Sequence, residues 1–144
     1  MTHQDNGHFA AKHPKGAAAA VAIAQAVLEK SSPHGLSCLA AHQIATQLNV
    51  PPRDVGIAVD LQEIPIRQCQ LGLFGHSPQS KSVRPINPVN AELSDAIKAA
   101  LHNGRLSCME AWRIADALAI PRIDVANACE ALKIKINQCQ LGAF

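Results

Sequence analysis

The fold of this chain is decided by residues 36–74, LSCLAAHQIATQLNVPPRDVGIAVDLQEIPIRQCQLGLF, which recur at residues 106–144 as LSCMEAWRIADALAIPRIDVANACEALKIKINQCQLGAF. The two stretches align without a gap and share 19 identities over 39 paired positions. Shared composition does not produce identity at this level. Two copies are too few for a solenoid, which needs at least three stacked units. The duplication therefore predicts two similar small units related by a pseudo-two-fold.

The apolar periodicity within each copy predicts three helices. The first is expected at residues 17–30 in one copy and from Asn87-Pro88 onward in the other. The second begins after Ser37 or Ser107, whose hydroxyls cap it, and Glu110 completes a capping box in the second copy. A third helix follows a tight turn that contains proline.

A short strand is expected after the third helix of each copy, because isoleucines alternate with other residues at 64–68 and 134–138. Pro65 lacks an N–H donor, so we expect its strand to lie at an edge or to point this position away from any partner. After its predicted strand the second copy continues only to Phe144, which leaves no residues for a second strand to pair with the first. We expect the strands of the two copies to pair with each other or with a second chain.

Composition agrees with a mainly α fold with short β-strands. The 144 residues are 48% hydrophobic but only 3% aromatic, so the core must consist of Ala, Leu, Ile and Val, which favours helices. No apolar run reaches the roughly 20 residues of a membrane span, and we expect a cytoplasmic protein without a membrane segment. The expected organisation is a flexible tail at 1–16, a repeat at 17–74, a linker at 75–88 and a repeat at 89–144.

Residues Ala40–Ile66 and Ala111–Ile136 resemble the helix-turn-helix core of bacterial winged-helix regulators. In that family an Ile-Ala pair and a later Leu pack the second helix, and a Val with a following Ala packs the third. The resemblance covers each repeat and implies two tandem winged-helix-like repeats, each of three helices plus a strand. It also implies a DNA-binding transcriptional regulator whose third helices enter the major groove.

The resemblance assigns seven residues to DNA contacts. The third helices would read bases, with the Asn127 amide suited to adenine, and the strand regions would reach phosphates. The net charge of +2 lies in the tail and the linker, so the repeats are nearly neutral. Weak DNA binding by the monomer is therefore expected, with homodimerisation or the tails adding affinity. The seven residues are Arg53, Gly56, Arg67, Arg122, Asn127, Lys133 and Lys135.

Four of the five cysteines obey the duplication, Cys38 with Cys108 and Cys69 with Cys139. Their spacing excludes a local Cys-x-x-Cys zinc knuckle. Two alternatives remain: a four-thiolate zinc or iron–sulfur site, or small buried side chains. The fifth, Cys129, is expected in the core, and the repeated Gln-Cys-Gln-Leu-Gly-x-Phe is expected to end a strand in a turn that carries an apolar plug.

Motifs of catalysis do not stand out, because the chain has no Ser-His-Asp arrangement, no paired carboxylates and no glycine-rich phosphate loop. We therefore expect neither an enzyme nor a cofactor. Besides DNA-binding regulation, two functions stay open. One is a protein–protein interaction module on the same scaffold, and the other is a thiolate metal or redox sensor.

Overall fold

A computed structural model describes residues 8–14, 19–76 and 81–144 of the chain. The protein is mainly helical with a few short strands, and it divides into two compact units. Unit 1 comprises Met1–Cys69 and Gln140–Phe144, and unit 2 comprises Gln70–Cys139. Within the described ranges, no helix is long and apolar enough to cross a membrane.

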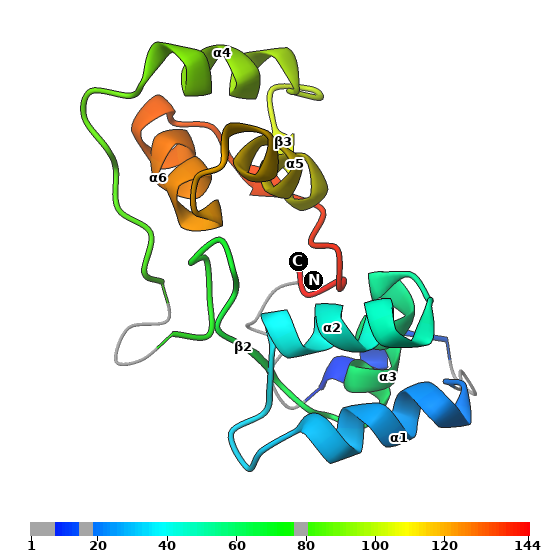
Figure 1. Ribbon diagram of the computed structural model, residues 1–144. Helices are drawn as coiled ribbons and strands as arrows, with labels where there is room; N and C mark the ends of the chain where they lie inside the picture. The colour runs from blue at the N-terminus through cyan, green and yellow to red at the C-terminus, as the bar shows by residue number, and fades with distance from the viewer. Residues whose placement is uncertain (1–7, 15–18, 77–80) are drawn as a thin grey trace. The chain divides into compact units, whose positions relative to one another are not determined.

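The two units contain the same order of elements, offset by 70 residues (Figure 1). Unit 1 begins with a 3₁₀-helix, η2, and both units then run helix, strand, helix, helix, strand. The elements of unit 1 are η2 (Phe9–Lys12), α1 (Val21–Lys30), β1 (Leu36–Ser37), α2 (Cys38–Leu48), α3 (Pro52–Leu61) and β2 (Ile66–Arg67). Those of unit 2 are α4 (Ala91–Ala99), β3 (Leu106–Ser107), α5 (Cys108–Leu118), α6 (Arg122–Leu132) and β4 (Ile136–Asn137).

Helix starts follow the expected caps in the second helix of each unit. The Ser37 hydroxyl accepts a hydrogen bond from the Ala40 amide at 3.1 Å, and Ser107 caps α5 in the same way. Glu110 pairs with Arg113 instead of completing the capping box. The expected start of α4 at Asn87-Pro88 is wrong, because the Asn90 side chain caps the helix three residues later.

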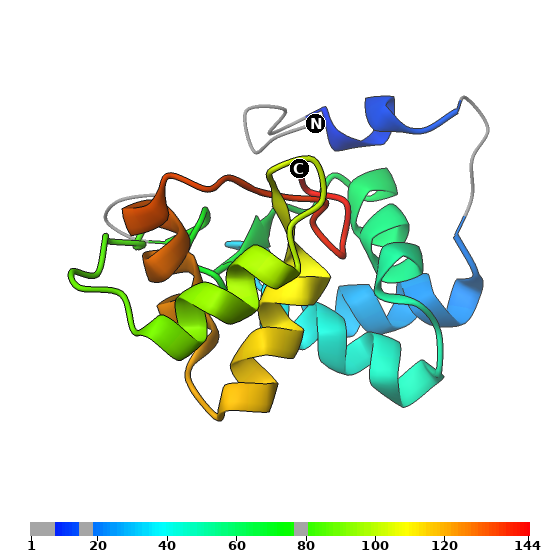
Figure 2. The same cartoon turned by 90° about the horizontal axis from the view of Figure 1, so that it is seen from above.

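The three helices of each unit pack on one another around small aliphatic side chains. Figure 2 shows α4, α5 and α6 side by side, and α1, α2 and α3 make the matching group. Ile44 and Val59 are buried in unit 1, as are Ile114 and Cys129 in unit 2, which confirms the predicted apolar stripes. Leu48, the last residue of α2, is 37% exposed.

The strands pair within their own units, so the expectation that they pair between copies or with a second chain is wrong. β1 and β2 form a two-stranded parallel sheet in which Leu36 lies opposite Ile66, and β3 and β4 repeat this register. The amide of Leu36 donates to the carbonyl of Pro65 at 2.9 Å. The two residues directly before the second helix of each unit therefore form the strand that pairs with the strand after the third helix.

The last five residues of the chain belong to unit 1, and residues 70–76 belong to unit 2. These boundaries differ from the expected division at 74 and 89. In unit 1 the Leu141 carbonyl lies so close to Gly56 of α3 that a Cβ there would overlap it. In unit 2 a Cβ on Gly72 would meet the Ile123 side chain of α6. Gly72 and Gly142 have φ of +75° and +78°, which agrees with the predicted turn.

Candidate functional site

Of the three residues assigned to DNA contacts in unit 1, Arg53 and Arg67 are exposed and Gly56 is buried. Arg53 is exposed at the start of α3. Gly56 is buried against Leu141, so it cannot approach a base edge. Arg67 is exposed, and its Nε donates to the carbonyl oxygen of His34 at 2.8 Å.

In unit 2, two of the assigned residues hold other parts of the unit in place. The Arg122 guanidinium lies over the Trp112 ring, 3.6 Å from its centroid, and its Nη1 donates to Gln70 Oε1 at 3.4 Å. The Asn127 Oδ1 atom accepts a hydrogen bond from the Arg84 amide at 2.8 Å. Both side chains therefore serve contacts within unit 2 that the sequence pattern does not indicate.

The repeat-related cysteines do not all have the same burial, since Cys139 is only partly buried. Cys38 and Cys108 are the first residues of α2 and α5, and both are buried, as is Cys69. Burial raises the pKa of the Cys129 thiol to about 11, because the thiolate would lose its solvation. The parts of the chain that the structure describes contain no group of three or more His, Cys, Asp or Glu side chains that could hold a metal ion.

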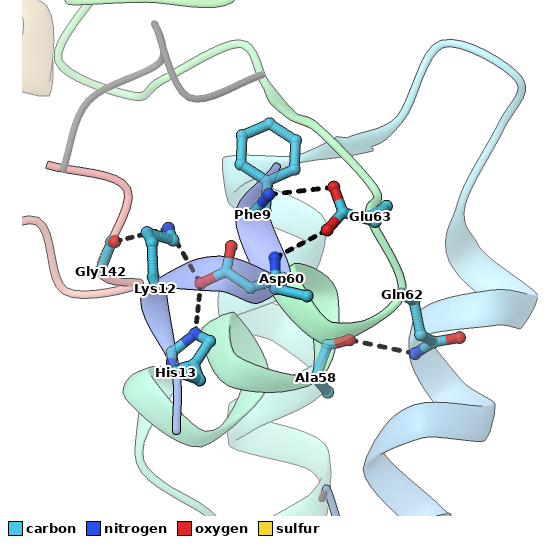
Figure 3. A network of polar contacts seen from close by, with 9 residues as sticks. Phe9, Lys12, His13, Ala58, Asp60, Gln62, Glu63 and Gly142 are labelled. Atoms are coloured by element: carbon cyan, nitrogen blue, oxygen red, sulfur yellow. Dashed lines mark hydrogen bonds and ion pairs between the residues drawn. The ribbon is translucent and has the colours of Figure 1, made fainter. Parts of the chain in front are cut away.

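A polar network within unit 1 joins η2 and His13 to the end of α3 and the turn after it (Figure 3). Glu63 accepts two backbone hydrogen bonds, from the amide of Phe9 at 2.9 Å and from that of Ala10 at 2.7 Å. The Oδ2 atom of Asp60 lies 2.9 Å from Lys12 Nζ and 2.8 Å from His13 Nε2. η2 is thus bound to α3 and the turn after it by two carboxylates.

The part of this network around Asp60 is buried, whereas Glu63 is exposed. Asp60 is 4% exposed, and among the described residues it is the one charged residue that is buried. Phe9 is 8% exposed, and Lys12 Nζ also donates to the carbonyl of Gly142 at 3.1 Å. Residues 8–14, which were expected in a flexible tail, make these contacts with α3 and the turn after it. Residues 1–7 and 15–18 of that tail lie outside the described residues.

Sequence reasoning did not identify this network, although a signal for it exists. The tail carries one aromatic residue, Phe9, followed closely by Lys12 and His13, while Asp60 and Glu63 stand one turn apart at the end of the third helix. Opposite charges in two segments are compatible with contact. Because the two segments are about fifty residues apart in the chain, local periodicity does not predict this contact.

Unit 2 has a pocket of about 450 Å³ beside α6. Lys133 and Lys135, both exposed, line it together with Lys81, whose Nζ lies 3.3 Å from Glu130 Oε1. The rest of its wall is mostly apolar: Leu73, Ala126, Cys129, Ile134 and Ile136. Two lysines that the resemblance assigned to phosphate contacts therefore lie at a concave surface with apolar walls.

Comparison with known proteins finds no family model, no curated protein and no solved structure that matches this chain. The function of the α3 surface and of the pocket beside α6 is therefore inferred from the residues that form them.

Proposed function

We propose that this protein is a protein-interaction module that binds short peptide segments beside the third helix of its units. The contact between Glu63 and η2 carries the proposal. Its carboxylate accepts two consecutive backbone amides, those of Phe9 and Ala10, as a receptor does when it binds the main chain of a peptide. Phe9 supplies the buried apolar anchor of the same segment.

The charge distribution supports peptide binding over duplex DNA. Unit 1 carries five basic and five acidic residues, and unit 2 carries eight basic and six acidic residues. Duplex affinity comes mainly from clustered Lys and Arg that displace counterions. On α3 the nearest charged neighbour of exposed Arg53 in sequence is Asp54, which opposes a phosphate contact.

The proposal is tested by panning a random peptide library on the immobilised full chain. Enriched peptides should bind the chain in solution by fluorescence anisotropy, and their binding should shift the amide NMR signals of residues 130–136 more than those of α4. A labelled random-sequence duplex at low salt is the matched nucleic-acid probe. No enriched peptide, together with a duplex shift that Arg53→Ala weakens, would contradict the proposal and support DNA binding.

A further inference from the structure

The surface that binds η2 in unit 1 has a counterpart in unit 2 with altered charges. At an offset of 70 residues, Asp60 corresponds to Glu130, Glu63 to Lys133 and Pro65 to Lys135. The backbone is matched too, since Glu63 has φ of 55° and Lys133 has φ of 59°. The counterpart is the wall of the pocket beside α6.

One feature of the η2 site is kept in unit 2. Lys12 neutralises Asp60 in unit 1, and Lys81 approaches both oxygens of Glu130 at 3.3 Å in unit 2. With Glu130 paired in this way, Lys133 and Lys135 add two exposed positive charges at the pocket rim. The position that accepts peptide amides in unit 1 thus carries an ammonium donor in unit 2, and an occupant must offer acceptors there.

The pocket is also suited to an apolar side chain. Its volume of about 450 Å³ lies in the range of small-ligand sites, roughly 300–1,000 Å³. Cys129, Ile134 and Ile136 supply apolar wall. An apolar interior with a charged rim is the arrangement that an anchored peptide requires.

We infer that this pocket binds an acidic segment of a partner protein. A bulky apolar side chain of the segment enters between Ile134 and Ile136, and its flanking carboxylates pair with Lys133 and Lys135. This inference rests on the proposed function and names the chemistry of the partner. Residues 8–14 of a second copy fit less well, because they would bring Lys12 and His13 toward these two lysines.

The test measures binding of labelled peptides to the full chain by fluorescence anisotropy. The acidic probe is acetyl-Asp-Glu-Phe-Leu-Asp-Glu-amide; its comparators replace Phe-Leu by Ala-Ala, or all four acids by Lys. A fourth probe has the sequence of residues 8–14. Lys133→Glu tests the charge at the rim, and Glu63 shows that a glutamate adopts this backbone conformation. Lys98→Glu makes the same charge change at an exposed position of α4 that does not line the pocket, and it is the matched control.

The chain should bind the acidic probe, and Lys133→Glu should weaken that binding about tenfold while Lys98→Glu changes it by less than about twofold. Replacing Phe-Leu by Ala-Ala should abolish it. Lys133→Glu should in turn bind the probe of residues 8–14 more tightly than the unaltered chain does, because it restores the acceptor found in unit 1.

Three results would overturn the inference. Equal weakening by Lys133→Glu and Lys98→Glu would show that the pocket is not the site, while peptide binding itself would stand. Preference for the Lys-containing comparator would overturn the acidic class alone. Binding of the labelled random-sequence duplex in place of every peptide, with sensitivity to Lys133→Glu, would overturn both the inference and the proposed function.

Discussion

Replacing Gly56 by alanine should destabilise unit 1, although alanine is the better helix former. In the interior of α3 the substitution favours the helix by about 1 kcal/mol. The new Cβ would overlap the Leu141 carbonyl, which is backbone and cannot rotate away. Residues 140–144 must then move, and Leu141, 2% exposed, loses a burial that contributes about 1.5–3 kcal/mol. The hydrogen bond from Lys12 to Gly142 is lost with it. The net loss should be about 1–2 kcal/mol.

Urea denaturation followed by circular dichroism measures this change, and the midpoint should fall by roughly 1 M. Hydrogen exchange at residues 140–144 should accelerate by a larger factor than exchange in α5. The matched control is Gly56→Ala in a chain that ends at residue 139, where the carbonyl is absent and the substitution should stabilise α3. An unchanged or raised midpoint in the full chain, with unchanged protection of residues 140–144, would refute the close approach of Leu141 to α3.

Three further substitutions test other contacts. Cys129→Val introduces the residue that unit 1 has at the corresponding position, Val59. In the unaltered chain the free energy of unfolding should fall by about 2–3 kcal/mol as pH rises from about 9 to about 11, and the substitution should remove this fall. Below that window the thiol is protonated in both states; within it only the unfolded thiol ionises. Urea midpoints across the pH range measure the difference, and parallel curves would contradict it. Glu63→Ala should free the η2 amides and raise their hydrogen exchange, with a cost of about 1–3 kcal/mol; unchanged exchange would argue against the network. Asn90→Ala should cost about 1 kcal/mol in thermal unfolding through its lost bond to Leu93, and a change of only a few tenths would show that the cap is unimportant.

Local pattern was sufficient for most of the helices. The stripe containing Ile44 and Ala45 identified α2, because side chains three and four residues apart share one face of a helix. Ser37 and Ser107 marked helix starts correctly, since their hydroxyls reach an amide three residues away. The start at Asn90 was missed because Asn87-Pro88, three residues earlier, has the asparagine-proline pattern of a helix start.

The residues of the candidate site were harder to predict from the sequence. Gly56, Arg122 and Asn127 were chosen for their places on the third helices, where an exposed side chain could reach DNA. Their actual neighbours are Leu141, Trp112 and the Arg84 amide. Except for Trp112, ten residues from Arg122, these neighbours lie more than forty residues away in the chain, and helical periodicity does not encode such contacts.

The sequence by itself determined the two matched sets of three helices and a short strand, the capping serines, and the core place of Cys129. Each depends on contacts within a few residues or on the duplication itself. The tertiary structure alone decided that β2 pairs with β1, that Gln140–Phe144 belongs to unit 1, and that η2 lies on Asp60 and Glu63. These are choices among partners of similar chemistry, and burial and hydrogen bonding between distant segments selected one of them.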